Sequence, residues 1–221
     1  MGKLIDVDLL LKFGSEENMK KLLKGEVYLS TLKSFKESDD PERGDCCEGD
    51  IYIEHFDEEN TSIFINDKEV KAKNIELSVS DCLNQNVFCL YAVKNEDAVR
   101  NLKDGHLIID TRDFDAFNKN DNGASCVAIQ AIPEFLKRVE NSIKQMGLKY
   151  EIELVYYYEN TYNGKLTPFM KRDRYSSQKE FRIWVKNTQN EPLILNIGNI
   201  SDIASFIPSQ SEIRVTYGKL K

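Results

Sequence analysis

The sequence predicts an α+β fold: a mixed, mostly antiparallel sheet with one long helix packed on a face. Two observations lead to this prediction. Short runs of alternating apolar and polar residues, the pattern of half-buried strands, recur along most of the chain. Helical periodicity is clearest in a single stretch, residues 132–146. Strands and helices that do not alternate regularly are typical of an α+β domain.

The chain is expected to open as strand, helix, strand. Residues 9–13 and 27–30 have the apolar content of strands. Between them, residues 16–24 place methionine and leucine at helical spacing, and Ser15 precedes them as a candidate N-cap. Residues 36–50 follow as a long acidic loop interrupted by proline and glycine.

The middle of the chain is predicted to supply most of the sheet. Short alternating runs within residues 51–79, with Asn66 and Asp67 as a hairpin turn, indicate an antiparallel meander. Residues 87–93 are almost entirely apolar, which is typical of a central strand buried on both faces. Two further segments are interpreted in the same way, 107–110 and 126–130.

The second half is predicted to contain the long helix and the last strands. An apolar stripe runs along the helix through Ile132, Phe135, Leu136, Val139, Ile143 and Met146. Alternating residues predict a long strand over 150–158 and another over 180–186. The tail, residues 192–217, is predicted to form two strands around a short helix near 202–206. No repeat or linker interrupts the chain, so we expect one domain over residues 1–221.

Composition limits the classes of protein to consider. The apolar run at 9–11 is too short and too closely flanked by charge for an export signal, and no stretch approaches a membrane span. Five cysteines without a regular framework indicate free thiols and a cytoplasmic protein. The formal net charge of −7 argues against a general nucleic-acid binder.

The strand over 180–186 carries the most informative pattern. Phe181, Ile183 and Val185 face one side, so the other side presents Glu180, Arg182 and Trp184. We interpret Glu180 and Arg182 as a candidate catalytic pair in a ligand cleft. The carboxylate would orient a ribose hydroxyl or act as a base, and the guanidinium would hold a phosphate. The alternative is a structural ion pair on a solvated sheet face, with the indole used for packing.

The acidic loop supplies further candidate ligand-binding residues, Arg43, Asp45 and Glu48, because glycine-rich loops often carry binding groups in front of a scaffold. The alternative is a solvated loop without a function. The adjacent Cys46 and Cys47 lack the spacing of zinc ligands, so no metal site is expected. Glycine-rich dinucleotide and phosphate-loop motifs are missing from the sequence, which argues against hydride transfer and ATP hydrolysis.

A basic segment precedes the strand over 180–186. Lys171, Arg172 and Arg174 are followed by Tyr175, so the cations can contact phosphates while the ring stacks on a base. A solvated, charged loop remains the simpler reading, since Asp173 interrupts the run.

Two stretches resemble one uncharacterised bacterial and phage family. They are LLLKFGSEENMKKLLKGEVYLSTLKSFKES, followed by RGDCCEG, and PFMKRDRYSSQKEFRIWV. Their order is also similar to that of ADP-ribosyltransferases, which carry an NAD-contacting residue on the first strand, a Ser/Thr turn, and a glutamate on a late strand. This resemblance implies corresponding roles for Lys12, for Ser30 with Thr31, and for Glu180. Lys12 stands where that fold has histidine or arginine.

The leading hypothesis is a nucleotide-handling protein of a phage and host conflict system, with a nucleotide or NAD-like small molecule as its ligand. The sequence names no specific cofactor. The alternative is a non-catalytic module that recognises a protein partner through an acidic surface. Clustering of Glu180, Arg182, Asp45 and Glu48 in one pocket would favour the first hypothesis, whereas a flat acidic patch would favour the second.

Overall fold

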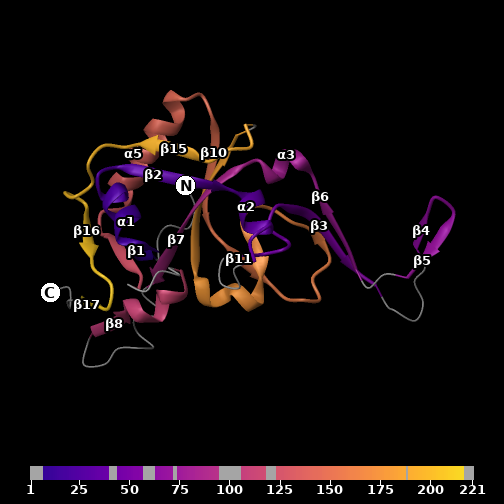
Figure 1. The fold of residues 1–221 in the computed structure, drawn as a ribbon, viewed down its shortest axis with the longest axis horizontal. Coiled ribbons are helices and arrows are strands. Elements are labelled where there is room, and N and C mark those ends of the chain that lie inside the picture. Colours follow the sequence, from indigo (N-terminus) through magenta and orange to yellow (C-terminus); the bar gives the residue numbers. More distant parts are fainter. Residues whose placement is uncertain are drawn as a thin grey trace.

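The large sheet is built from strands that are far apart in the sequence. The computed structural model describes residues 7–39, 44–56, 63–71, 74–94, 106–117, 123–187 and 189–216. Within them the predicted α+β fold is confirmed, and the eight-stranded sheet is antiparallel throughout (Figure 1). Its main path runs β10 (Lys149–Leu154), β14 (Glu180–Lys186), β7 (Asn86–Lys94), β1 (Val7–Gly14), β9 (Ser125–Ile129), β16 (Ala204–Ile207). Off this path, β2 (Glu26–Thr31) pairs with both β7 and β15 (Leu193–Asn196).

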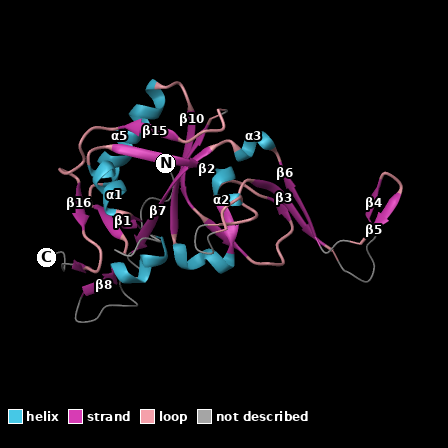
Figure 2. Cartoon of the chain, viewed as in Figure 1, coloured by secondary structure: helices cyan, strands magenta, loops and turns pink. Residues whose placement is uncertain are grey.

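The described residues also form four smaller sheets and several helices. The small sheets are β3 (Asp50–His55) with β6 (Asn74–Ser78) and β12 (Gly164–Lys165); β11 (Tyr156–Tyr158) with β13 (Met170–Arg172); β8 (His106–Asp110) with β17 (Glu212–Thr216); and β4 (Ile63–Ile65) with β5 (Lys68–Val70). Of these strands, β3, β6, β4 and β5 extend to one side of the large sheet (Figure 2). The helices are α1 (Glu16–Leu23), α2 (Leu32–Lys36), α3 (Ser80–Leu83), α5 (Ile132–Gln145), and the 3-10 turns η1 (Thr111–Phe117) and η2 (Asp173–Gln178).

The opening strand, helix and strand agree with the prediction. Ser15 caps α1, and its hydroxyl accepts a hydrogen bond from the backbone N–H of Asn18 over 3.3 Å. The helix leads into β2 through Gly25, which has a φ of 99°. A Cβ atom at this position would lie 2.0 Å from the carbonyl oxygen of Gly198, so the turn requires glycine.

Helix α5 covers one face of the large sheet and ends one residue earlier than predicted. Its apolar stripe from Ile132 to Ile143 is buried in the same core cluster as Phe181, Ile183 and Val185 of β14. Met146, predicted to extend the stripe, lies beyond the end of the helix and is 49% exposed. The opposite face of the helix is solvated at Lys137 and Lys144. A second cluster, which includes Leu9 and Leu11, packs on the other face beneath β8 and β17. The sheet is therefore covered on both sides.

Two predictions for the middle of the chain are wrong in topology. Residues 51–79 form no meander of successive neighbours, because β3 pairs with β6 and β4 pairs with β5. Asn66 and Asp67 do form the tight turn between β4 and β5, with φ of 48° and 62°, and Figure 1 shows this hairpin projecting from the body. The segment 107–110 is no central strand either, since β8 pairs with β17 in a two-stranded sheet that leaves Ile108 exposed.

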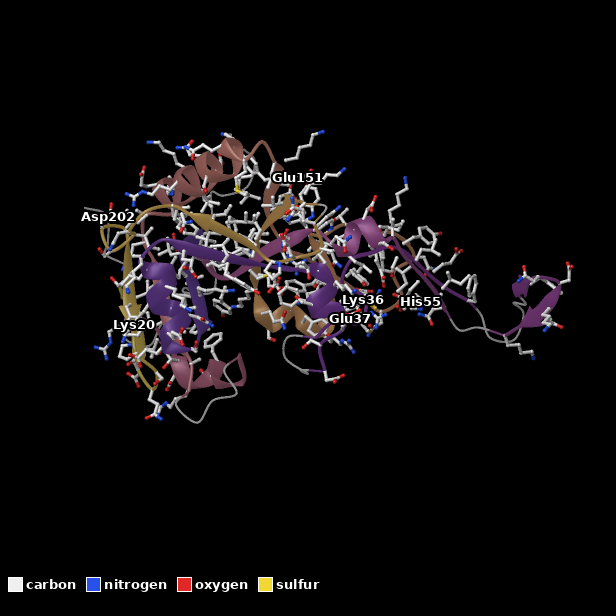
Figure 3. The ribbon with its side chains drawn as sticks, turned by 45° about the horizontal axis from the view of Figure 1, so that its top comes forward. Lys20, Lys36, Glu37, His55, Glu151 and Asp202 are labelled. Carbon is white, nitrogen blue, oxygen red and sulfur yellow. The ribbon has the colours of Figure 1, made fainter. Side chains whose placement is uncertain are left out.

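Two predictions for the second half also need correction. The strand expected over 150–158 breaks at Val155, whose N–H donates to the carbonyl of Glu180, and β11 then pairs with β13. The break interrupts the alternation, so Val155 is buried and Tyr156 is exposed, while Tyr158 is buried as the pattern predicts. No helix forms at 202–206. Asp202, labelled in Figure 3, lies in a turn, and β16 follows as a strand because it pairs with β9.

No helix among the described residues combines the length and the apolar character needed to cross a membrane.

Candidate functional site

The large sheet is split where β7 changes partners. One edge of β7 pairs with β1 over Tyr91–Lys94 and with β2 only at Asn86 and Val87. Between these two stretches, Phe88, Cys89 and Leu90 are paired on the opposite edge, with β14. Strands β1 and β2 therefore diverge along β7 and leave an opening within the sheet.

A cavity of about 790 Å³ occupies this opening. Residues 11–15 with Asn18 and Met19 form one side, and Glu26, Tyr28 and Ser30 of β2 form the other. The middle of β7 also lines the cavity. Lys171, Glu180 and Arg182 close one end, and they come from β13 and β14. The first strand and the late strand thus contribute to one site although some 160 residues of sequence separate Lys12 from Lys171.

Four charged side chains meet at that end, and we call them the ion cluster: Glu48, Lys171, Glu180 and Arg182. Lys171 Nζ lies 2.7 Å from Glu180 Oε1. Arg182 donates to Glu180 Oε2 through Nη2 (2.7 Å) and to Glu48 Oε1 through Nη1 (2.6 Å). Each of the four residues is at most 7% exposed. Two cations and two anions balance one another, as a buried set of charges requires.

Uncharged groups complete the hydrogen bonding around the ion cluster. Gln178 Oε1 accepts from Lys171 Nζ over 2.8 Å, and the carbonyl oxygen of Pro168 accepts from Arg182. The hydroxyl of Tyr157 accepts from the backbone N–H of Glu180 over 2.8 Å. The ring of Tyr175 lies 4.8 Å from Lys171 Nζ. These contacts hold the charged groups in one arrangement.

The charges determine what Glu180 can do chemically. Burial alone would raise the pKa of Glu180, but Arg182 and Lys171 together outweigh it and hold that pKa well below its usual range. Burial likewise opposes the charged form of Lys171, yet Glu180 and Glu48 raise the pKa of Lys171. Glu180 is therefore a permanent anion at neutral pH. It is suited to accepting hydrogen bonds or stabilising positive charge, and poorly suited to exchanging a proton.

Aromatic side chains form the cavity wall beside β1. The rings of Phe13 and Phe114 are stacked, with centroids 3.8 Å apart and planes 5° from parallel. Tyr91 meets Phe114 edge-on at 5.2 Å. All three residues are partly exposed and line the cavity. Such a wall offers a flat, apolar surface to a planar ring.

Lys12 also lines the cavity. Its Nζ donates to the carbonyl oxygen of Cys89 over 2.7 Å and lies 4.6 Å from the centroid of the Phe88 ring. The thiol of Cys89 also lines the cavity. Burial and the neighbouring Glu180 raise the pKa of Cys89 to about 11, so this thiol stays protonated at neutral pH and is a poor nucleophile.

The cavity brings together five of the residues predicted from the sequence: Lys12, Ser30, Lys171, Glu180 and Arg182. Glu48 joins them through the ion cluster. Neither Glu180 nor Arg182 lies on a solvated sheet face, since they are 7% and 1% exposed. Of the four residues whose clustering in one pocket would favour the first hypothesis, Glu180 and Arg182 line the cavity, Glu48 contacts Arg182 without lining it, and Asp45 lies apart.

The other predicted residues lie elsewhere. Residues 44–50 of the acidic loop form a turn, which we call the acidic turn. Asp45 is buried in it and accepts a hydrogen bond from the N–H of Cys47 over 3.1 Å. Arg174 donates to the hydroxyl of Tyr175, which donates to the carbonyl of Gly44, and both side chains line a second depression. Trp184 donates to Gln85 over 2.7 Å and lines neither hollow. Arg43 lies outside the described residues.

Sequence reasoning missed the aromatic wall and the tyrosine that supports Glu180. Phe13, Tyr91 and Tyr157 all sit on predicted strands, where an apolar ring is normally assigned to the core. Phe13 falls on the same face of its strand as Leu11, and this alternation does not show that the face borders a cavity. The cavity depends on which strands pair with one another, and no local sequence pattern contains that information.

Comparisons with protein-family models, with curated proteins and with solved structures found no match. The case for a function rests on the geometry described above.

Proposed function

We propose that the protein binds a nucleotide, of the NAD-like class, in the cavity between β1 and β2. One observation carries the proposal: an aromatic wall and a permanently charged carboxylate with neighbouring cations line the same cavity. A nucleotide presents the matching groups, namely a planar ring, hydroxyls and anionic phosphates. The volume of the cavity also falls within the range of about 300–1,000 Å³ that small-molecule sites occupy.

Each part of such a ligand has a counterpart in the cavity. A base or nicotinamide ring would pack on the wall formed by Phe13, Tyr91 and Phe114. A ribose hydroxyl would donate to Glu180 Oε1, which accepts from Lys171 and has a further lone pair. Phosphate oxygens would lie near Lys12, whose ammonium acts as a point charge.

The position of Glu180 allows two roles, an ionised group that stabilises charge or a general base, and its charge state distinguishes between them. A glutamate that stays ionised orients hydroxyls and stabilises a developing positive charge, whereas a general base must take up a proton near the working pH. The lowered pKa of Glu180 supports the first role. A transfer reaction at the ribose, as in the ADP-ribosyltransferase resemblance, would use this role. The link to a phage and host conflict system rests on the sequence resemblance alone.

The alternative, recognition of a protein through an acidic surface, has less support. Two carboxylates of the acidic loop, Asp45 and Glu48, are only 2% and 3% exposed. Asp50 at the end of the loop is buried as well. A docking surface needs its charges at the solvent boundary, so residues 44–50 of this loop favour the cavity, whereas Glu37 and Asp39 at its start are exposed.

Isothermal titration with NAD⁺, ADP-ribose, ATP and GTP tests the proposal. Tyr28 lines the cavity and is half exposed, so Tyr28→Ala removes an aromatic contact without opening the core. We expect it to weaken binding of the preferred nucleotide by about tenfold, the loss typical of one stacking side chain. Lys12→Gln should weaken nucleotides with phosphates more than the parent nucleosides.

Tyr156→Ala is the matched control, because Tyr156 is an exposed tyrosine outside the cavity. It should bind as the unmodified chain does. Equal losses in Tyr28→Ala and Tyr156→Ala, or no binding of any of the four compounds, would reject the proposal.

A further inference from the structure

A group of thiols and carboxylates lies away from the cavity, where the acidic turn meets β3 and β6. The Sγ atoms of Cys46 and Cys47 are 3.6 Å apart, and Cys47 Sγ is 3.4 Å from Glu76 Oε2. Asp50 offers a carboxylate oxygen within 4.8 Å of the ligand atoms of both Cys47 and Glu76. The four side chains come from the turn and from two paired strands.

One oxygen of this group has no hydrogen-bond partner. Asp50 Oδ1 accepts from Lys36, labelled in Figure 3, and from Ser78. Asp50 Oδ2 accepts none, although the side chain is fully buried. Among the buried side-chain nitrogen and oxygen atoms of the described residues, it is the one that lacks a hydrogen-bond partner. A buried carboxylate oxygen without a donor is costly, so its place calls for a positively charged partner.

Neighbouring side chains hold one oxygen of each carboxylate of the group. Arg172 holds Glu76 through Oε1, at 2.6 Å, while Oε2 faces the thiol. Lys36 and Ser78 likewise hold Asp50 through Oδ1 and leave Oδ2. Side chains that bind the outer oxygen of a ligand in this way are the usual means of orienting carboxylates at a metal ion.

We propose that Cys46, Cys47, Asp50 and Glu76 form a site for a thiol-binding divalent cation, most simply Zn²⁺. Thiolates select such ions over Mg²⁺ and Ca²⁺, which prefer oxygen alone. Tetrahedral zinc places neighbouring sulfur and oxygen ligands roughly 3.6–3.8 Å apart, close to the two separations seen around Cys47. Cys46 is exposed, so its side chain can turn toward the ion without disturbing the core.

An ion could reach this site from solvent, and its binding would affect the acidic turn. Cys46 lines the second depression, which connects the group to solvent. Glu48 lies between Cys47 and Asp50 in the sequence and enters the ion cluster. A bound ion would therefore tie the turn that carries Glu48 to β3 and β6. The site needs no nucleotide in the cavity, so it stands or falls separately from the proposed function.

Titration of the full chain, kept in a phosphine reductant, with Zn²⁺ and with Co²⁺ tests the site. We expect one equivalent of either metal to bind, and Co²⁺ to show a sulfur-to-metal charge-transfer band in the near ultraviolet. Cys47→Ser should weaken the band, and the double variant Cys46→Ser with Cys47→Ser should abolish it. Asp50→Asn and Glu76→Gln should each lower the affinity for Zn²⁺ by about tenfold or more, the loss that follows even from removing an outer partner of a ligand.

Cys82→Ser is the matched control, because Cys82 is a free thiol outside the group. It should bind as the unmodified chain does. Near-ultraviolet circular dichroism checks folding, and if Asp50→Asn fails that check the exposed side of the site is tested with Glu76→Gln and Cys46→Ser. An unchanged affinity for Zn²⁺ in both carboxylate variants would overturn the mixed site, and reduced protein that binds neither metal would overturn the site altogether.

Discussion

Arg182 and Glu48 lie 134 residues apart in the sequence and form a two-point ion pair in the buried ion cluster. Nη1 donates to Oε1 over 2.6 Å and Nη2 donates to Oε2 over 3.2 Å. The pair fastens the acidic turn to β14, beside the end of the cavity. Because both groups are almost fully buried, neither can regain water if its partner is removed.

Removing one member of this pair should therefore cost much stability. Glu48→Gln or Arg182→Met leaves an unbalanced charge in the interior, and we expect the free energy of unfolding to fall by about 3–5 kcal/mol. Urea unfolding followed by circular dichroism measures the change. The double variant should recover part of the loss, because it removes both charges together.

An exposed ion pair in the same chain provides the control. Arg138 and Asp202 are 2.6 Å apart, and the Asp202 side chain is 57% exposed. Asp202→Asn should leave the unfolding curve almost unchanged, since solvated pairs contribute little. Comparable losses of stability for the two pairs would show that burial does not determine how much the ion cluster contributes to the free energy of unfolding.

Acid should weaken the fold through Glu180. Its pKa in the folded chain is lowered, and its reference value is 4.5. A lowered pKa contributes stability that is complete above the unfolded value and is lost as pH falls toward the folded value. The free energy of unfolding should decline from about pH 5 downward. Urea titrations between pH 3 and 6 should show a shallower decline in Glu180→Gln, and an identical slope would contradict the assignment.

The register of β14 shows how much of the site a local pattern contains. Alternation over residues 180–186 placed Glu180 and Arg182 on one face and Phe181 on the other, as the structure has them. The burial of α5 followed from its apolar stripe in the same way. Both predictions rest on the spacing of residues within one strand or one helix, and this spacing determines which way a side chain points.

What the sequence could not provide depends on pairing between distant strands. The cavity exists because β1 and β2 diverge along β7, and no run of residues records that divergence. The break at Val155 likewise comes from its bond to the carbonyl of Glu180, in another strand. The group around Cys47 was missed because Glu76 reaches it through the pairing of β3 and β6. Each case is a long-range contact overriding a local preference.

The five cysteines should differ widely in reactivity. All are free thiols, and Cys46 is the exposed one. Burial raises the pKa of Cys47, raises that of Cys126 to about 12, and contributes most to the value of about 11 for Cys89. The thiolate is the reactive form, so iodoacetamide at pH 7.5 should modify Cys46 first in the metal-free, reduced chain. Peptide mass spectrometry over a time course measures the order, and early modification of Cys89 or Cys126 would contradict it.

The turn between α1 and β2 allows strain and steric clash to be separated. Gly25 and Gly147 both have positive φ, 99° and 69°, so alanine at either position adopts an unfavourable backbone conformation that costs about 1–2 kcal/mol. At Gly147 a Cβ atom would meet nothing within 4 Å, whereas at Gly25 it would lie 2.0 Å from the backbone oxygen of Gly198.

Backbone cannot move aside as a flexible side chain can. Gly147→Ala should therefore lose only the conformational cost, and Gly25→Ala should lose clearly more in urea unfolding. Gly25→Ala should also weaken nucleotide binding, because α1 and β2 both line the cavity. Equal losses for the two variants would mean that the contact between Gly25 and Gly198 does not hold this edge of the site in place.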